Sequence, residues 1–455
     1  MNDGLFPVGA VGASSFGPAA VRNLAKRRAL YSWMMALKPT TFALSGTGGG
    51  TEFMCLDIPD DFYAVRVGFM NITGSTFAVS AVKAVGSAPT SSYVVPVDED
   101  GGAILDSEWS SLTFAMAGAN DDRIVTAAGA PTAITVAATA TDAATGTTDN
   151  PAWTMTDWVP CLSRGASPTT GMRRLMIRAL VPSSQTVTYN AFLIGSVWPD
   201  FPISQGYLAY HGGRNNNLDY VTSPATGANL TNSGNTVLTG AGPVIGIVQV
   251  LTNKGVLQGM HDGDSTYAGT GTTGGVYTMA LISAITLGNE YLGEVPVSNV
   301  CAATGGTPSS VFFPRFATLL PIVKPSYALL PGWTSNDIGV GSLTPDELLA
   351  HFTARQRYAI NLCIQNDVVP IISTPWGLNT ITASYLPVWR QLRQNVFDLA
   401  SQGVPIVDAF GQCGNVATAN YLPGMDTGDG LHPSDRANLI GANALMPVIK
   451  GIAGF

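Results

Sequence analysis

The chain has 455 residues, which is too long for one ordinary domain and predicts two or three. Only 11% of the residues are charged, less than half of the usual share of about 25%, so small polar residues must cover much of the surface. The net charge is −8 and most of the chain lacks a basic patch, which argues against nucleic acid as a partner.

Residues 1–40 are expected to form an N-terminal segment with one short helix. A cationic cluster at 26–28 precedes an apolar run at 29–37, but it starts too late for a secretory signal peptide. No stretch approaches ~20 uninterrupted apolar residues, so no membrane span is predicted. The helix is expected to dock on the next domain or on a partner subunit. Its apolar side would carry Val21, Leu24, Tyr31 and Met35.

Residues 41–243 are predicted to be β structure. Val65, Val67 and Phe69 alternate with Arg66 and Gly68, and the same alternation recurs over 174–181. A period of two indicates half-buried strands. Several short strands without intervening helices predict a β-sandwich of the jelly-roll kind, although the order of the strands is not readable.

Strands and helices alternate over residues 244–455. Apolar strands are predicted at 244–251, 255–260, 327–330, 368–373 and 404–409, and helices at 312–323 (in part), 386–401 and 434–449. The sequence Thr344-Pro345-Asp346-Glu347 is a capping box that begins a further helix. This alternation predicts a mostly parallel sheet with helices on both faces and with the chemistry at the carboxyl ends of the strands.

Two turns in this part of the chain carry polar residues that could take part in catalysis. Ser265 comes after a strand, where Gly263 gives backbone room and Asp264 can tie the turn, so its hydroxyl can point into a crevice. Asp429 lies three residues before His432, close enough to reach the ring Nδ1. Taken singly, the first turn also fits an ordinary N-cap serine and the second a surface histidine at a helix start.

Four blocks in this order resemble the SGNH/GDSL hydrolase family, over about residues 245–455. The first ~240 residues lie outside the resemblance. It implies a flavodoxin-like three-layer α/β/α domain that acts as a serine esterase and needs no metal or cofactor. The blocks are Gly263-Asp264-Ser265-Thr266, the loop 300–307, Thr334-Ser335-Asn336-Asp337 and Asp429-Gly430-Leu431-His432-Pro433.

The resemblance also implies a role for each residue. Ser265 would be the nucleophile, His432 the general base and then the general acid, and Asp429 the residue that orients His432. The amide of Gly305 and the side chain of Asn336 would join the Ser265 amide in the oxyanion hole.

Two features depart from the family pattern or leave a choice open. Thr334 stands where the family usually has glycine, so the loop that carries Asn336 is expected to differ from the loop of the family. Gly306 is the alternative donor to Gly305. Near these blocks, His261 and Asp262 are expected to be structural, while Trp333 and Trp376 fit either core packing or a pocket wall.

The favoured substrate is an O-acetylated polysaccharide. A β region of low charge, rich in Gly and Thr, without a signal peptide, looks similar to virion-attached phage tail esterases. Two alternatives stay open: an esterase for lipid or short-chain acyl groups, and a virion receptor-binding or structural protein with a passenger hydrolase domain. An extracellular or virion-associated location is expected, with the cytoplasm as an alternative, and the N-terminal region is a candidate for homo-oligomer formation or virion attachment.

Overall fold

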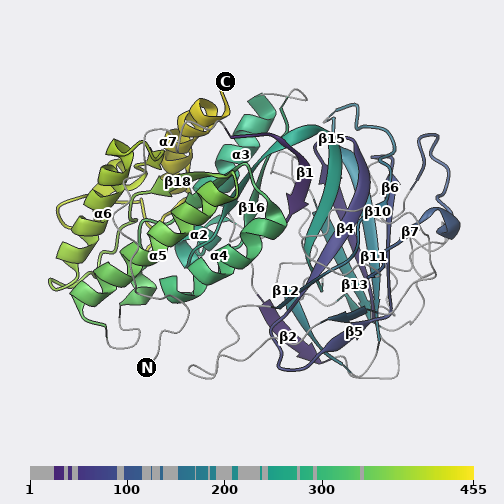
Figure 1. Cartoon of the computed structure of the whole chain (residues 1–455), viewed down its shortest axis with the longest axis horizontal. Helices are drawn as coiled ribbons and strands as arrows, with labels where there is room; N and C mark the ends of the chain where they lie inside the picture. Colours follow the sequence, from purple (N-terminus) through teal and green to yellow (C-terminus); the bar gives the residue numbers. More distant parts are fainter. Residues whose placement is uncertain are drawn as a thin grey trace.

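The computed structural model describes residues 25–34, 39–43, 50–89, 97–114, 124, 134–136, 152–169, 171–182, 185–190, 207–213, 236–237, 244–273, 277–290, 295–338 and 343–454. Strands dominate the described part before residue 244, and strands alternate with helices after it (Figure 1). None of the helices in these ranges is both long and apolar enough to cross a bilayer.

One antiparallel sheet of six strands lies wholly in the first half of the chain. Its order is β14 (Thr236–Val237), β13 (Tyr207–Gly213), β3 (Gly50–Ile58), β11 (Arg173–Val181), β6 (Ala81–Ser87) and β7 (Ser110–Ser111). Two small antiparallel pairs form separate sheets: β2 (Pro39–Ala43) with β12 (Thr186–Asn190), and β5 (Phe77–Val79) with β8 (Ile134–Val136). A 3-10 turn, η1 (Asp106–Glu108), precedes β7.

The alternating strand β11 is buried on both of its faces. The apolar residues on one face are buried as predicted: Leu175, Ile177, Ala179 and Val181. Arg174 and Arg178, on the opposite face, are also buried. Arg174 Nε donates to Asp57 Oδ1 at 3.0 Å, and the Arg178 guanidinium lies 4.1 Å from the ring centroid of Trp109. These contacts compensate the buried cations, so the prediction of a half-exposed strand is wrong here.

A second sheet joins the two halves of the chain through the strand β15 (Ile245–His261). The first part of β15 pairs antiparallel with β1 (Arg28–Trp33) and β4 (Phe62–Asn71). Its last residues pair parallel with β16 (Val297–Cys301) and β17 (Tyr327–Leu330). The short strands β9 (Ala152–Met155) and β10 (Val159–Pro160) pair with β4. The two strands predicted at 244–251 and 255–260 are therefore one element.

The strand β15 is sharply bent. Ser32 of β1 accepts a hydrogen bond on its hydroxyl from Gln249 (2.7 Å), and its backbone bonds twice with the side chain of Gln258 (3.1 and 2.6 Å). Nine residues of straight strand would span ~30 Å, so the chain must turn between these two glutamines. Gly255, with φ +84°, lies in this interval and supplies a conformation that glycine adopts easily. Figure 1 shows β15 arching over the top of the molecule.

The predicted N-terminal helix is wrong for residues 28–33, which form β1. The open edge of β15 offers backbone partners along these residues, and Tyr31 becomes buried against the sheet. Arg28 further donates to the carbonyls of Asn366 and Asp367, at 3.3 and 2.9 Å, so the segment is fixed to the second half of the chain. Three of the residues expected on the helix face, Val21, Leu24 and Met35, lie outside the described residues.

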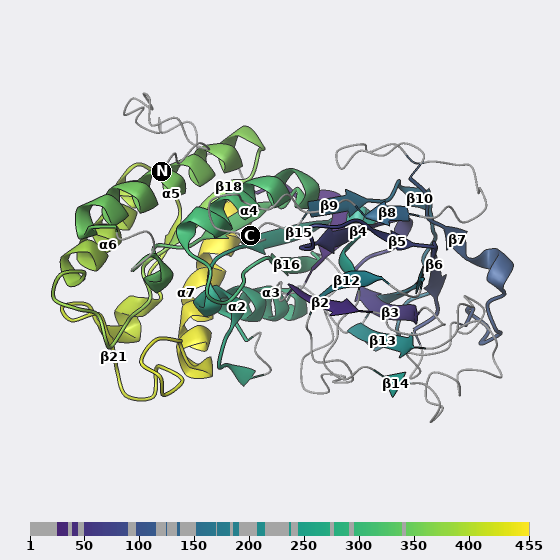
Figure 2. The same cartoon turned by 90° about the horizontal axis from the view of Figure 1, so that it is seen from below.

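The second half has the predicted three layers. Its parallel strands lie in the order β16-β15-β17-β18-β19, with β18 at Val369–Ser373 and β19 at Ile406–Val407. In chain order this is 2-1-3-4-5, the flavodoxin-like arrangement. Helices α4 (Ser309–Val323), α5 (Pro345–Gln365) and α6 (Leu386–Ser401) cover one face, and α3 (Met279–Glu290) and α7 (Asp435–Ala453) the other (Figure 2). A small hairpin, β20 (Gly414–Asn415) with β21 (Asn420–Tyr421), precedes α7.

Local signals place the helix starts. Thr344 and Glu347 form the predicted capping box of α5, and Ser434 caps α7. The helix α4 begins at Ser309, earlier than expected, and runs through two prolines.

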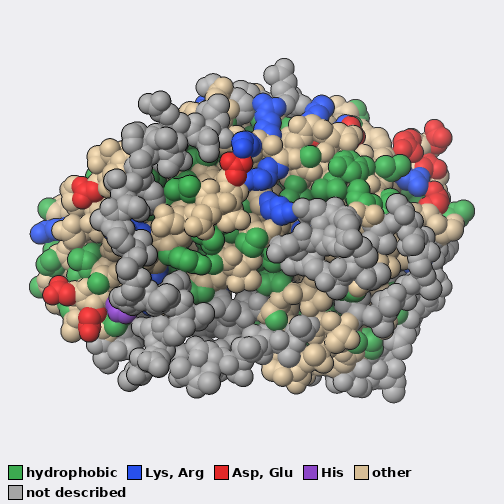
Figure 3. Space-filling model, viewed as in Figure 1, with side chains coloured by type: hydrophobic (Ala, Val, Ile, Leu, Met, Phe, Trp, Pro, Cys, Tyr) green, Lys and Arg blue, Asp and Glu red, His purple; other side chains and the backbone are tan. Residues whose placement is uncertain are grey.

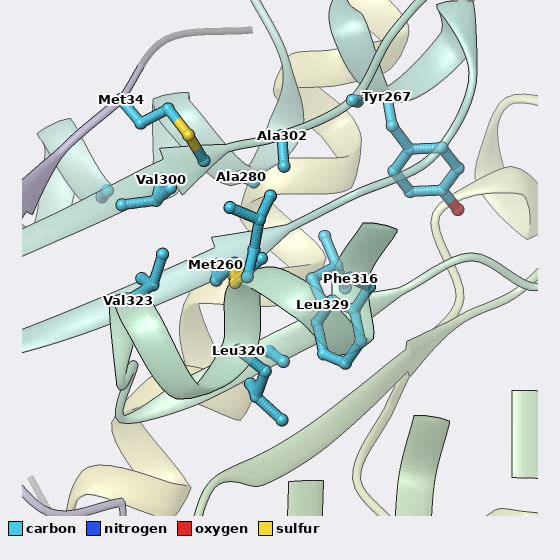
Figure 4. Close-up of a cluster of buried hydrophobic side chains, with 14 of the residues drawn as sticks. Met34, Met260, Tyr267, Ala280, Val300, Ala302, Phe316, Leu320, Val323 and Leu329 are labelled. Carbon is cyan, nitrogen blue, oxygen red and sulfur yellow. The ribbon is translucent and has the colours of Figure 1, made fainter. Parts of the chain in front are cut away.

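One hydrophobic core extends through both halves. Figure 4 shows a part of it, in which Met260 and Leu329 of the sheet meet Phe316 and Leu320 of α4. Met34, just after β1, lies in the same cluster. Figure 3 shows one face of the molecule, on which charged side chains are sparse among the described residues, as the composition requires.

Candidate active site

The nucleophile turn lies between β15 and the short helix α2 (Ser265–Ala268). Asp264 caps α2, because its Oδ1 accepts the Thr266 amide at 2.9 Å. A Cβ on Gly263 would lie 2.8 Å from the ring of Tyr267, so only glycine fits there. The turn presents Ser265, which is partly exposed, at the carboxyl edge of the sheet.

Ser265, His432 and Asp429 form one hydrogen-bonded chain. His432 Nε2 lies 2.8 Å from Ser265 Oγ, and His432 Nδ1 lies 2.5 Å from Asp429 Oδ2. Asp429 Oδ1 accepts the amides of Leu431 and His432, both at 2.9 Å. Partial burial raises the pKa of Asp429, but these hydrogen bonds and the imidazole outweigh it and lower the pKa to about 2. The ionised carboxylate therefore requires the proton on Nδ1 and leaves the Nε2 lone pair facing the hydroxyl.

The turn that carries His432 is fixed by its own backbone. Gly430 has φ +73°, and a Cβ there would lie 2.9 Å from Asn379 Cβ. The Asn379 amide donates to the Gly430 carbonyl at 2.8 Å, and Asp426 Oδ2 accepts the Gly430 amide at 2.9 Å. The Thr427 amide donates to the His432 carbonyl at 2.8 Å. The ring is thus oriented before any substrate arrives.

The structure places Gly305, rather than Gly306, against the nucleophile. A Cβ on Gly305 would lie 3.7 Å from Ser265 Cβ and 3.9 Å from Thr270 Oγ1. A Cβ on Gly306 would meet nothing within 4 Å. The loop is tied to the nucleophile turn, because the Thr304 amide donates to the Gly263 carbonyl at 3.2 Å and the Thr307 hydroxyl lies 3.0 Å from the same carbonyl.

Asn336 belongs to the 3-10 turn η5 (Ser335–Asp337), which lies beside the Gly305 loop. Its Nδ2 donates to the Thr307 carbonyl at 3.3 Å. Thr334 caps η5, and its Oγ1 accepts the Asn336 amide at 3.2 Å. The same hydroxyl donates to Asp264 Oδ2 at 2.5 Å. The residue that departs from the family pattern therefore joins η5 to the nucleophile turn, which the sequence reasoning missed.

His261, at the end of β15, is buried and structural, as expected. Its Nε2 lies 3.0 Å from the Tyr267 carbonyl, an acceptor, so Nε2 carries the proton. Asn299 Nδ2 then donates to Nδ1 at 2.8 Å. Burial lowers the pKa of His261 to about 4, so the ring is neutral at neutral pH.

Asp262 is paired with Arg315, a residue that the sequence reasoning did not single out. Arg315 Nε donates to Asp262 Oδ2 at 3.0 Å, and its Nη2 donates to the Gly263 carbonyl at 3.2 Å. Burial raises the pKa of Asp262, against the effect of the guanidinium. The pair holds the backbone that enters the nucleophile turn, since both side chains are buried. No local sequence signal reveals it, because Arg315 reaches the turn from the middle of α4.

Trp333 and Trp376 pack in the core. Each is 4% exposed, and the Trp333 indole N–H donates to the Trp376 carbonyl at 3.1 Å. The Trp389 indole donates to the same carbonyl at 2.8 Å. Of the two alternatives, core packing therefore holds. In the described residues, no group of three or more His, Cys, Asp or Glu is arranged to hold a metal ion.

Several solved structures are similar to this chain. A lipolytic protein of the G-D-S-L family from Desulfitobacterium hafniense is 14% identical, with 42% of this chain and 99% of that chain covered and a TM-score of 0.35. The lipase/acylhydrolase from Enterococcus faecalis is 19% identical (43% and 95% covered, TM-score 0.35). An acetyl xylan esterase from Geobacillus stearothermophilus is 18% identical (42% and 94% covered, TM-score 0.35). No protein-family model and no curated protein matches the sequence.

The first of these structures carries the name of the G-D-S-L family, which is the family that the four sequence blocks resemble.

Proposed function

We propose that this protein is a serine esterase that works through an acyl-enzyme on Ser265. The observation that carries the proposal is the continuous chain from Ser265 Oγ to His432 Nε2 and from His432 Nδ1 to Asp429, with distances of 2.8 and 2.5 Å. A hydroxyl, a base and a carboxylate in this order are what acyl transfer requires.

The proposed reaction has two halves. Ser265 Oγ attacks the ester carbonyl carbon while its proton passes to His432 Nε2. The tetrahedral intermediate expels the alcohol, which takes that proton from His432. Water then gives a proton to Nε2 and attacks the acyl carbon, and collapse releases the carboxylic acid and returns the proton to Ser265. Asp429 keeps its charge throughout and stabilises the imidazolium.

We assign the oxyanion hole to three donors. The Ser265 amide is the first of α2, and amides at a helix start have no acceptor within the helix. The Gly305 backbone lies beside Ser265 on the exposed side of the turn. The Asn336 amide group has two protons; one is used on the Thr307 carbonyl, and the second is assigned to the oxyanion.

We further propose that the acyl group is acetyl and that its carrier is a polysaccharide. Gly305 and Thr270 both lie against Ser265, and neither brings a large apolar side chain to it, which is consistent with a short acyl chain. Within the described ranges, the large apolar side chains with high exposure lie outside the nucleophile turn, the Gly305 loop and η5. A lipid esterase would be expected to present an apolar groove there.

In this proposal, residues 41–243 form an accessory β-sandwich that positions the glycan. The composition of the chain, which is sparsely charged and rich in Gly and Thr, favours a location outside cells or on a virion. The alternative, a receptor-binding protein with an idle hydrolase, differs in predicting no turnover at all.

The test is release of acid from p-nitrophenyl acetate and from acetylated polysaccharides. Wild type should release acetate and Ser265→Ala should lose it, while the matched control Ser310→Ala, on the exposed side of α4, should behave as wild type. Release from p-nitrophenyl laurate but not from acetyl substrates would replace the deacetylase proposal by the lipid esterase. Absence of release from every ester would overturn the enzyme proposal.

A further inference from the structure

We propose that Thr334 is a positioning residue that locks the oxyanion donor Asn336 to the nucleophile turn through Asp264. The inference rests on the proposed function, because it assigns a role in assembling that same site. Its starting point is the hydroxyl of Thr334, which contacts both the Asn336 backbone and the residue before Ser265.

The direction of each hydrogen bond follows from counting protons. The Asn336 amide can only donate, so the Thr334 hydroxyl accepts at 3.2 Å. The single proton of that hydroxyl is then directed to Asp264 Oδ2 at 2.5 Å. Asp264 Oδ1 accepts the Thr266 amide. One carboxylate thus holds the start of α2 with one oxygen and the cap of η5 with the other.

A second route closes these contacts into a ring. Asn336 Nδ2 donates to the Thr307 carbonyl, and the Thr307 hydroxyl lies 2.7 Å from the Thr304 carbonyl and 3.0 Å from the Gly263 carbonyl. The Thr304 amide also donates to the Gly263 carbonyl, at 3.2 Å. Gly263 is bonded covalently to Asp264, which meets the Thr334 hydroxyl. The donor side chain of Asn336 is therefore held at its backbone by Thr334 and at its amide group by Thr307, and both paths end at the nucleophile turn.

Burial makes this link hard to replace with water. Thr334 is 1% exposed and Asp264 is 3% exposed. Burial raises the pKa of Asp264, whereas the bonds from Thr334 and Thr266 lower it, so these donors help to keep its charge. Removing the hydroxyl leaves the half-buried Asn336 amide and a buried carboxylate oxygen of Asp264 each short of one partner.

The expected result is a loss of rate without a matching loss of substrate binding. Thr334→Val keeps the shape and removes the hydroxyl. We expect kcat on p-nitrophenyl acetate to fall ~10–100-fold with KM within about threefold, since displacement of a catalytic donor acts mainly on the transition state. Thr334→Ser restores the hydroxyl and should return kcat to within about threefold of wild type.

A matched control makes the same chemical change elsewhere. Thr318, exposed on α4, donates only to the Pro314 carbonyl among the bonds described, and Thr318→Val should leave kcat unchanged. Thermal unfolding of each variant shows whether the protein is folded at the assay temperature, so a rate loss in folded protein is separated from a loss of folded protein.

Amide hydrogen exchange tests the same link without any substrate. The Asn336 amide should exchange slowly in wild type and in Thr334→Ser, and at least tenfold faster in Thr334→Val. Unchanged exchange, or unchanged kcat in an active protein, would overturn the positioning role. If wild type hydrolyses no ester, the proposed function fails, while the exchange result still decides whether Thr334 holds Asn336.

Discussion

The substitution Asp429→Asn tests the proton arrangement of the site. In wild type, Asp429 Oδ2 accepts the His432 Nδ1 proton at 2.5 Å, and Oδ1 accepts two backbone amides. If the new Asn keeps its oxygen toward the amides, its NH₂ group faces Nδ1 and the ring proton must move to Nε2. Nε2–H would then donate to Ser265 Oγ, and Nε2 would have no lone pair left to take the hydroxyl proton.

The opposite orientation of the Asn has its own cost. It returns the proton to Nδ1 but sets the NH₂ group against the amides of Leu431 and His432, at a cost of about 2–3 kcal/mol. About one molecule in 100 would then hold the active tautomer. The carboxylate charge that stabilises the imidazolium is also absent. We therefore expect kcat to fall ~10³–10⁴-fold, with little change in fold.

The assay is the steady-state hydrolysis of p-nitrophenyl acetate at neutral pH. Asp398→Asn, an exposed change of the same kind on α6, serves as the control and should keep full activity. A kcat for Asp429→Asn within tenfold of wild type would refute the tautomer argument.

Three further predictions concern stability and selectivity. Because burial holds the pKa of His261 at about 4, below its ordinary 6.5, only the unfolded chain binds this proton between those pH values. The contribution of neutral His261 to the free energy of unfolding is therefore fully present above pH 6.5, and up to about 3 kcal/mol of it is lost as the pH falls toward 4. Melting curves across this range should show a smaller loss of stability for His261→Gln than for wild type. Equal losses would count against this linkage. Gly305→Ala should fold normally, since its Cβ finds ordinary contacts, but should reduce turnover of butyrate esters ~10-fold more than that of acetate esters; equal effects would contradict the placement of the acyl group beside Gly305. Gln258→Met should lower the free energy of unfolding, measured by chemical denaturation, by about 2–4 kcal/mol. The reason is that the buried N–H and C=O of Ser32 lose their hydrogen-bond partner, the Gln258 side chain. A change below about 1 kcal/mol would show that water or another group takes the place of that side chain.

The parts of the fold with strong local signals were predictable. The capping box at Thr344, the helix 386–401 and the strands at 327–330 and 369–373 depend on residues within one element. The four blocks also brought Ser265, Asp429 and His432 together correctly as neighbours, since each block lies at a turn whose chemistry is local.

Other features depend on partners far along the chain. An apolar run such as 29–37 fits a helix or a strand equally, and the deciding contact is the edge of β15, more than 200 residues away. Two separate strands were predicted at 244–251 and 255–260, yet Gly255, with its positive φ, allows a bend inside one continuous strand. Arg315 and Thr334 act on the nucleophile turn from other elements, so no spacing in the sequence reveals them.

The shared strand β15 limits how the protein can be divided or recombined. A cut at the predicted boundary of 243/244 would keep β15 but remove β1 and β4, its antiparallel neighbours. The fragment would present two unpaired strand edges, which are templates for aggregation. It would also lose the Ser32 contacts that hold the bend. The catalytic half is therefore not an exchangeable cassette: transplanting it onto another carrier requires residues 28–71 to travel with it.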